Sequence, residues 1–151
     1  MTADARLLLV DGNDDFLDGL SAWIAACRGF QVVGVAHSAN EAFERIDLLA
    51  PDMVLMDVTL PDMNGLDATR RIKSRAGAPL VILMTFLDSG AARAEAKAAG
   101  ADGCLSKSEI TGEFSRVVGT LWRLRLGRPG WSGAVPGVAH PNPGKKREIE
   151  E

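Results

Sequence analysis

The chain has 151 residues, of which 46% are hydrophobic and 25% are charged, and its formal net charge is −3 at pH 7. This composition is typical of a globular protein and argues against a disordered or a membrane-embedded chain. The length suits one domain with its own core plus an appendage. No stretch has the length of a membrane span and the start has no secretory pattern, so we expect cytoplasmic localisation.

Charge is divided unevenly along the chain. Residues 1–122 carry 17 acidic and 11 basic side chains, whereas residues 123–151 carry 3 and 6. Because nucleic-acid affinity depends on basic groups that neutralise phosphates, the acidic body predicts no direct nucleic-acid binding. Cys27 and Cys104 lie in apolar runs, and we expect two buried thiols rather than metal or redox centres.

Five short aliphatic runs alternate with segments of helical periodicity. This is the pattern of an α/β fold with a parallel sheet and crossover helices on both faces. Most of the runs are almost continuously apolar, as expected for strands that are covered on both sides. We predict five strands, at Arg6–Val10, Phe30–Val35, Asp52–Met56, Leu80–Met84 and Gly103–Ser106.

The segments between these strands have apolar residues at helical spacing. One apolar stripe runs from Phe16 to Cys27, and a second, from Ala39 to Leu49, follows a capping box formed by Ser38 and Glu41. The Ala-rich segment Ala91–Ala98 predicts a helix that packs lightly, and a stripe from Ile110 to Leu121 predicts a last helix. The pattern stops at Arg123, and the remaining 29 residues contain 5 Gly and 4 Pro. We therefore predict a folded domain over 1–122 and a flexible tail over 123–151 without a second folded domain.

Polar residues follow the ends of four predicted strands. Asp11 and Asp57 follow the first and third strands, and Thr85 and Lys107 follow the fourth and fifth. Ligands of open parallel sheets bind beyond the carboxyl ends of the strands. We therefore expect these four side chains to converge at one edge of the fold.

Four blocks of the sequence together resemble the receiver domains of two-component response regulators. The resemblance covers about residues 5–122, and the block with Asp57, Pro61 and Gly65 is its most specific part. It implies a flavodoxin-like strand order of 2-1-3-4-5. It also implies a histidine kinase or phosphotransfer protein as donor and a downstream protein partner, and it leaves the oligomeric state open. The blocks are LLLVDGNDDF, DMVLMDVTLPDMNGLDATRRIK, PLVILMTF and GADGCLSK.

The same resemblance assigns expected roles to the residues at the strand ends. Asp57 would accept a phosphoryl group as an acyl phosphate. Asp11, Asp57 and the backbone carbonyl of Thr59 would hold Mg²⁺, which neutralises charge on the transferring oxygens. The Thr85 hydroxyl would turn toward the new phosphate and Lys107 would pair with it. The activity implied is at most self-phosphorylation and self-dephosphorylation, which is not that of a classical enzyme.

The sequence departs from the family pattern at several positions. Gly12 stands where the family has a second acid that binds the metal, which predicts weaker Mg²⁺ binding. Phe86 replaces a small residue and predicts restricted access to the phosphorylation site. Cys104 replaces an aromatic residue that changes rotamer on activation, and Ser108 replaces a proline after the lysine. The fold should not depend on these changes, whereas ordinary switching should.

Three alternatives to a phosphoacceptor remain. A degenerate receiver would bind its partner without phosphorylation, and Gly12, Phe86 and Cys104 favour it. A hydrolase of the haloacid dehalogenase type needs a second Asp two residues after Asp57, where this chain has Thr59. A flavin carrier with the same strand order needs a first loop that cradles a phosphate, and the acidic loop 11–15 would repel one.

Overall fold

Five parallel strands form one sheet in the order β2-β1-β3-β4-β5, within the part of the chain that this computed structural model describes, residues 4–126. All four neighbouring pairs are parallel. The predicted fold class and strand order are therefore confirmed, and each predicted strand lies within one residue of its observed ends. The strands are β1 (Ala5–Val10), β2 (Phe30–Ala36), β3 (Met53–Asp57), β4 (Leu80–Thr85) and β5 (Gly103–Ser106).

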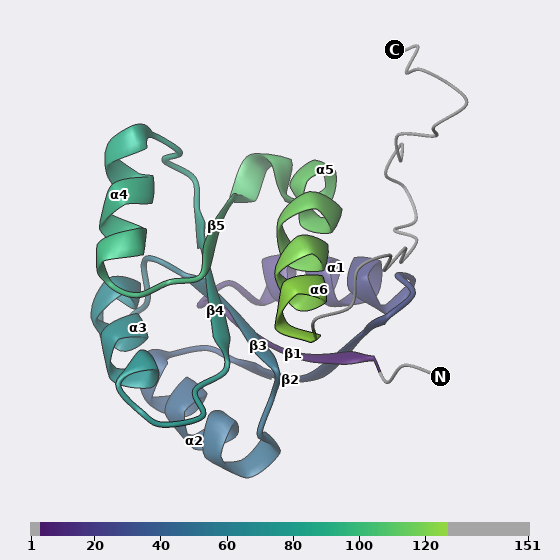
Figure 1. Cartoon of the computed structure of the whole chain (residues 1–151), viewed down its shortest axis with the longest axis horizontal. Coiled ribbons are helices and arrows are strands. Elements are labelled where there is room, and N and C mark those ends of the chain that lie inside the picture. The colour runs from purple at the N-terminus through teal and green to yellow at the C-terminus, as the bar shows by residue number, and fades with distance from the viewer. Residues whose placement is uncertain (1–3, 127–151) are drawn as a thin grey trace.

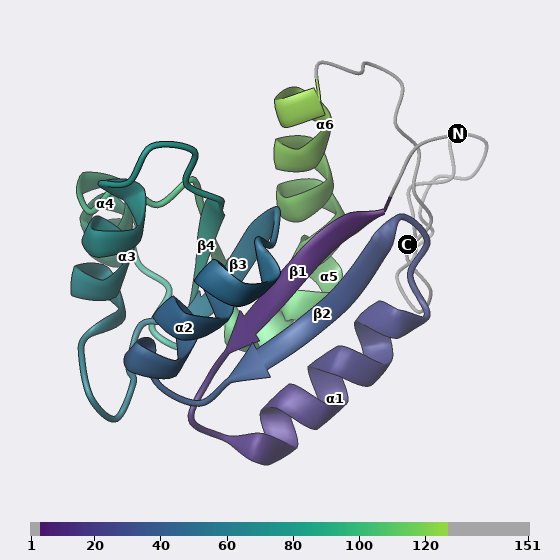
Figure 2. The ribbon, with the colours of Figure 1, turned by 90° about the horizontal axis from the view of Figure 1, so that it is seen from below.

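Helices cover both faces of the sheet (Figure 1). One face carries α1, α5 and α6, and the other carries α2, α3 and α4. The view from below in Figure 2 shows α1 running along the β1–β2 side of the sheet. None of the helices within residues 4–126 is long and apolar enough to cross a membrane. Their bounds are α1 (Asp14–Ala25), α2 (Ala39–Leu49), α3 (Gly65–Lys73), α4 (Gly90–Ala98), α5 (Ile110–Phe114) and α6 (Thr120–Leu126).

The sheet separates two hydrophobic clusters. Successive residues of a strand point to opposite faces, so each inner strand supplies both clusters. Leu7 and Leu9 of β1 pack toward α1 and α5, whereas Leu8 and Val10 pack toward α2 and α3. Burial on both faces explains why the inner strands have almost continuously apolar sequences.

The two thiols and the light packing of α4 agree with the sequence analysis. Cys27 and Cys104 are free and buried. Burial raises the pKa of the Cys27 thiol to about 11, and burial also raises the pKa of Cys104 above its usual value. Of the α4 side chains only Ala96 is buried. This helix is therefore held by less apolar contact than the others on its face.

The cap of α2 differs in one detail from the predicted capping box. The Ser38 hydroxyl accepts a hydrogen bond from the Glu41 N–H at 3.1 Å, as predicted. The Glu41 carboxylate, however, accepts its bond from the N–H of His37, one residue before the cap. The helix start is therefore secured through two residues of the preceding loop.

The last helix is interrupted and runs further than the sequence predicted. A π-helical turn over Ser115–Gly119 separates α5 from α6. The predicted last helix ended at Leu121, whereas α6 continues to Leu126, which packs against the core. The predicted tail beyond residue 126 lies outside the described residues.

Candidate functional site

Three of the four residues at the strand ends meet in one cluster. The Lys107 ammonium lies 2.6 Å from Oδ2 of Asp11 and 3.3 Å from Oδ2 of Asp57. Asp11 directly follows β1, Asp57 is the last residue of β3, and Lys107 follows β5. The parallel arrangement of the strands therefore brings together side chains that are up to 96 residues apart.

The cluster is buried except at Asp57. The side chains of Lys107 and Asp11 are 5% and 2% exposed, whereas that of Asp57 is 15% exposed. Burial raises the pKa of the Asp57 carboxyl above its usual value, and the Asp11 carboxylate acts in the same direction, although the Thr59 N–H and Lys107 lower it in part. Two carboxylates and one ammonium leave a formal charge of −1 in this cluster. Asp57 is thus the acid of the cluster that solvent or a ligand can reach.

The loop after β3 folds back closely on Asp57. The Gly65 N–H donates to the Val58 carbonyl at 2.6 Å, and Thr59 forms an antiparallel bridge with Asn64. A Cβ on Gly65 would lie 2.8 Å from Val58 Cα and would collide with the Asp57 carbonyl oxygen. Only glycine allows this approach. The loop in turn places the Thr59 N–H 3.2 Å from Oδ1 of Asp57.

The loop after β1 supplies no second acid to the cluster. Asn13 caps α1, because its side chain accepts the Phe16 N–H at 2.9 Å. The Asn13 N–H donates to Asp11 Oδ1 at 2.8 Å, and Asp14 lies 2.6 Å from Nε2 of His37. A Cβ on Gly12 would have ordinary contacts, at 3.6 Å from Pro61 Cδ. The position of the missing acid therefore has room for a side chain.

Thr85 is buried at the end of β4, and its hydroxyl is engaged locally. Its Oγ1 accepts the Leu87 N–H at 3.0 Å, which closes a short turn around Phe86. The Phe86 side chain is 72% exposed, and its ring centroid lies 4.8 Å from the Lys107 ammonium. The fourth predicted residue thus lies at the same edge of the sheet, with its hydroxyl bound to backbone.

Two residues that the sequence analysis did not single out for this edge connect its loops. Asp62 accepts the N–H groups of Ala39 and Asn40 at the start of α2, both at 2.9 Å. Burial raises the pKa of Asp62, but these hydrogen bonds lower it by more. The pKa of this carboxyl therefore lies below its usual value. His37 pairs with both Asp14 and Glu41. No local pattern marks Asp62, because its partners lie 22 and 23 residues away.

The donors at the cluster fit a Mg²⁺ ion. Within residues 4–126, no three His, Cys, Asp or Glu side chains are grouped to hold a metal. The carboxylates of Asp11 and Asp57 are the acidic donors here, and Mg²⁺ commonly binds one or two carboxylates while it keeps several waters. The formal charge of −1 favours a cation. Because Asp11 Oδ2 already pairs with Lys107, the ion would share this carboxylate with the ammonium.

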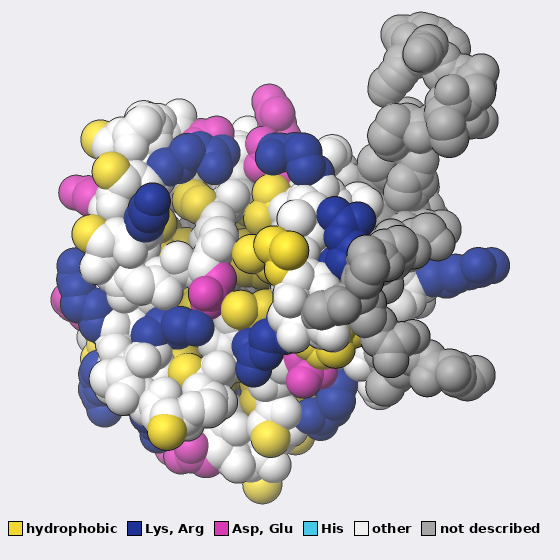
Figure 3. Space-filling view, viewed as in Figure 1, with side chains coloured by type: hydrophobic (Ala, Val, Ile, Leu, Met, Phe, Trp, Pro, Cys, Tyr) yellow, Lys and Arg dark blue, Asp and Glu magenta, His cyan; other side chains and the backbone are white. Residues whose placement is uncertain are grey.

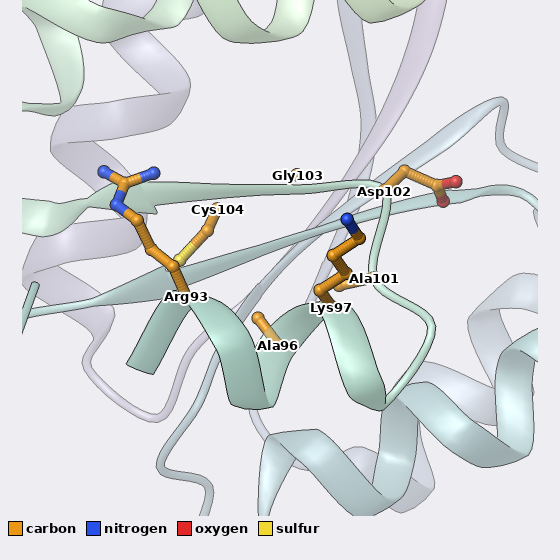
Figure 4. A pocket seen from close by; sticks show the side chains of 7 residues that line it. All are labelled: Arg93, Ala96, Lys97, Ala101, Asp102, Gly103 and Cys104. Carbon is orange, nitrogen blue, oxygen red and sulfur yellow. The ribbon is translucent and has the colours of Figure 1, made fainter. Parts of the chain in front are cut away.

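Two surface hollows lie outside the Asp11–Asp57–Lys107 cluster, and Phe16, whose ring contacts Lys107, lines one of them. Hydrophobic side chains gather over β5 and α6 on the face shown in Figure 3, with Lys and Arg side chains around them. A hollow of about 270 Å³ lies between α4 and β5 (Figure 4), where Arg93 and Lys97 flank Cys104. A groove of about 300 Å³ lies between α1 and α5 and includes Phe16. Cys104, a small side chain, lines the hollow between α4 and β5.

Residues 7–118 match the family described as the response regulator receiver domain. This match spans most of the chain. The sheet order and the cluster at the strand ends agree with it. The chain belongs to the response regulator receiver domain family.

Curated relatives and solved structures agree with this family. The chain is 31% identical over 116 residues to the transcriptional regulatory protein LnrK of Bacillus subtilis (strain 168), which covers 77% of this chain and 53% of the relative. It is 33% identical over 113 residues to the response regulator GacA of Pseudomonas viridiflava, which covers 75% of this chain and 53% of the relative. The chain thus spans about half the length of these relatives.

Among solved structures, a two-component response regulator of the LuxR family from Aurantimonas sp. SI85-9A1 is 32% identical, with a TM-score of 0.71, over 83% of this chain and 88% of that one. The response regulator domain of CheB from Thermotoga maritima is 29% identical, with a TM-score of 0.65, over 80% of this chain and 92% of that one. Each likeness therefore covers at least four fifths of this chain.

Proposed function

We propose that Asp57 accepts a phosphoryl group from a phosphohistidine of a histidine kinase or phosphotransfer protein, and that this change alters the binding of a downstream protein. The observation that carries the proposal is the cluster in which Asp57, the most exposed of three charged residues, lies 3.3 Å from Lys107 and beside Asp11. Because kinases form phosphohistidine from ATP, the proposal places the domain in the cytoplasm.

The reaction needs an ionised carboxylate with a free path to phosphorus. A carboxylate oxygen of Asp57 forms the new O–P bond while the P–N bond of the phosphohistidine breaks. The imidazole nitrogen keeps the electron pair of that bond. Lys107 offsets negative charge next to the attacking carboxylate, and the Thr59 N–H fixes Oδ1. Asp57 and Lys107 thus have complementary parts in this step.

Asp11, Asp57 and the Thr59 carbonyl would hold Mg²⁺ in the proposal. When bound, the ion would supply positive charge to the transferring phosphoryl oxygens. Asp11 orients the site even without it, because its two oxygens hold the Asn13 N–H and the Lys107 ammonium. Gly12 leaves the cluster with one carboxylate fewer than the family pattern, so we expect weak Mg²⁺ binding.

Thr85 supports a switch that responds to the phosphoryl group. Its hydroxyl is bound to the Leu87 backbone in this structure. A dianion on Asp57 would offer it a stronger, charge-assisted partner. The hydroxyl would then gain a contact that is present only in the phosphorylated state, which is the condition for a shift between two conformations.

Intact-mass spectrometry tests the proposal. Acetyl phosphate and Mg²⁺ should add one phosphoryl mass to the wild-type protein, and Asp57→Asn should remove this gain while its circular dichroism spectrum stays native. Asp52→Asn, an acid at the opposite end of β3, is a matched control that should still be labelled. If the folded wild-type protein gains no phosphoryl mass from acetyl phosphate or from a phosphorylated kinase, the phosphorylation-independent binding module is correct.

A further inference from the structure

The Lys107 ammonium lies within contact distance of two aromatic rings as well as two carboxylates. Its distance to the ring centroid is 4.3 Å for Phe16 and 4.8 Å for Phe86. Both values fall within the range of about 6 Å in which the face of an aromatic ring attracts a cation. Phe16 belongs to α1 and Phe86 follows β4, so the two rings approach the lysine from different elements.

Core packing does not explain the position of Phe86. Its side chain is 72% exposed, although a phenyl ring normally gains stability by burial. The turn that carries it is closed by the bond from the Leu87 N–H to the Thr85 hydroxyl. This turn directs the ring to Lys107, the one buried cation of the described residues. The contact with the ammonium is therefore the interaction that accounts for the ring.

Lysine needs such support to hold a fixed position. Its ammonium is a compact charge on a flexible stem, and the two carboxylates attract it unequally, at 2.6 Å for Asp11 and 3.3 Å for Asp57. Without the rings, the ammonium is free to leave Asp57 and pair with Asp11 alone. The two rings add attraction to the ammonium while both carboxylates stay in contact with it.

We propose that Phe16 and Phe86 are positioning residues that hold the Lys107 ammonium between Asp11 and Asp57. This inference rests on the proposed function, because Lys107 is positioned for phosphoryl transfer to Asp57. The Phe86 contact is also coupled to Thr85. The Thr85 hydroxyl accepts the Leu87 N–H and so closes the turn that carries the Phe86 ring.

Metal-free NMR of the lysine side chains tests the contact independently of activity. The chain has five lysines, and Lys107→Gln assigns the resonance of interest. Ring currents should shift the Lys107 εCH₂ protons upfield of the other four. Phe16→Leu and Phe86→Leu should each remove part of the shift, whereas Phe86→Tyr should keep it. A wild-type Lys107 resonance at the position of the other lysines would overturn the proposal.

Labelling kinetics test the positioning role. At saturating acetyl phosphate and Mg²⁺, Phe86→Leu and Phe16→Leu should each slow phosphorylation of Asp57 by about two- to fivefold, and Phe86→Tyr should restore the rate. Phe43→Leu, which removes a remote ring beneath Arg71, is the matched control and should leave both readouts unchanged. A Phe86→Leu rate equal to or above that of wild type overturns the positioning role. A wild-type protein that is never labelled overturns the proposed function, while the NMR shift still decides whether the rings hold the lysine.

Discussion

The Lys107 ammonium lies closer to Asp11 than to the candidate phosphoacceptor, at 2.6 Å from Asp11 Oδ2. Both side chains are almost fully buried, and a buried charge without a partner is strongly destabilising. Lys107 supplies the positive charge that the buried Asp11 carboxylate requires. A Mg²⁺ ion would therefore share the Asp11 carboxylate with the lysine.

Gly12→Asp should tighten Mg²⁺ binding by about tenfold or more, because it adds a carboxylate to a site that has two. The new Cβ would have only ordinary contacts, the nearest at 3.6 Å from Pro61 Cδ, so the variant should fold. Calorimetric titration gives the dissociation constant. Gly12→Asn, of similar size and without charge, is the matched control. Equal affinities for wild type and Gly12→Asp would mean that another side chain already fills the position.

Gly65→Ala should destabilise the fold by about 1–3 kcal/mol, the usual cost of overpacking. An added Cβ would meet backbone atoms of Asp57 and Val58, which cannot rotate away as a side chain can. Urea unfolding measures the loss. Gly112→Ala is the matched control, since nothing lies within 4 Å of its Cβ, and alanine there should raise stability slightly. Equal stability of Gly65→Ala and wild type would show that the loop shifts without cost.

His37→Gln should reduce stability in acid and have no effect in alkali. Burial lowers the pKa of His37, but Asp14 and Glu41 raise it more, so it lies above the ordinary value of 6.5. A raised histidine pKa contributes stability that is complete below 6.5 and is lost as the pH rises through the folded-state value. Since the ring is 45% exposed, solvent screening limits the effect to about 0.5 kcal/mol. Urea unfolding at about pH 5.5 and about pH 9 measures it. The same loss at both pH values would exclude an ionic origin.

A chain that ends at Trp122 should be less stable than one that ends at Leu126. The shorter chain loses the last turn of α6 and the packing of Leu126 on the core, worth about 1 kcal/mol for a partly buried leucine. Thermal melts should differ by a few degrees. Leu124→Ala in the longer chain is the control, because this side chain is 70% exposed and should contribute little. Identical melts would mean that the end of α6 is not held by the core.

The sheet could be predicted from the sequence because its strands are buried on both faces and therefore have distinctive apolar sequences. The end of the last helix could not be predicted from the sequence. Apolar periodicity identified Ile110 and Phe114, but the residues after Trp122 include Arg123 and Arg125, which resemble the start of a polar tail. Leu126 reaches the core only because the path of the helix changes before it.

The candidate site could be predicted as a set of residues but not as a set of contacts. Strand ends placed Asp11, Asp57 and Lys107 at one edge, and there they meet. Lys107 lies closer to Asp11 than to Asp57, and Phe16 lies against the Lys107 ammonium. Both contacts depend on the directions of side chains in elements about 90 residues apart in sequence. Such long-range geometry leaves no local pattern. The periodicity of α1 explained Phe16 as a core residue, and no sequence pattern connected it with the lysine.

The π-helical turn over Ser115–Gly119 determines which side of α6 faces the sheet. Buried side chains recur every four residues, at Ile110, Phe114, Val118 and Trp122, with Leu126 next. At 3.6 residues per turn, an uninterrupted α-helix would rotate by about 160° too far over these 16 residues, and Leu126 would face solvent. The wide π-helical turn removes part of this excess rotation. This π-helical turn therefore helps to keep the apolar side of α6 on the sheet. In an uninterrupted α-helix of the same sequence, Leu126 would point away from the sheet.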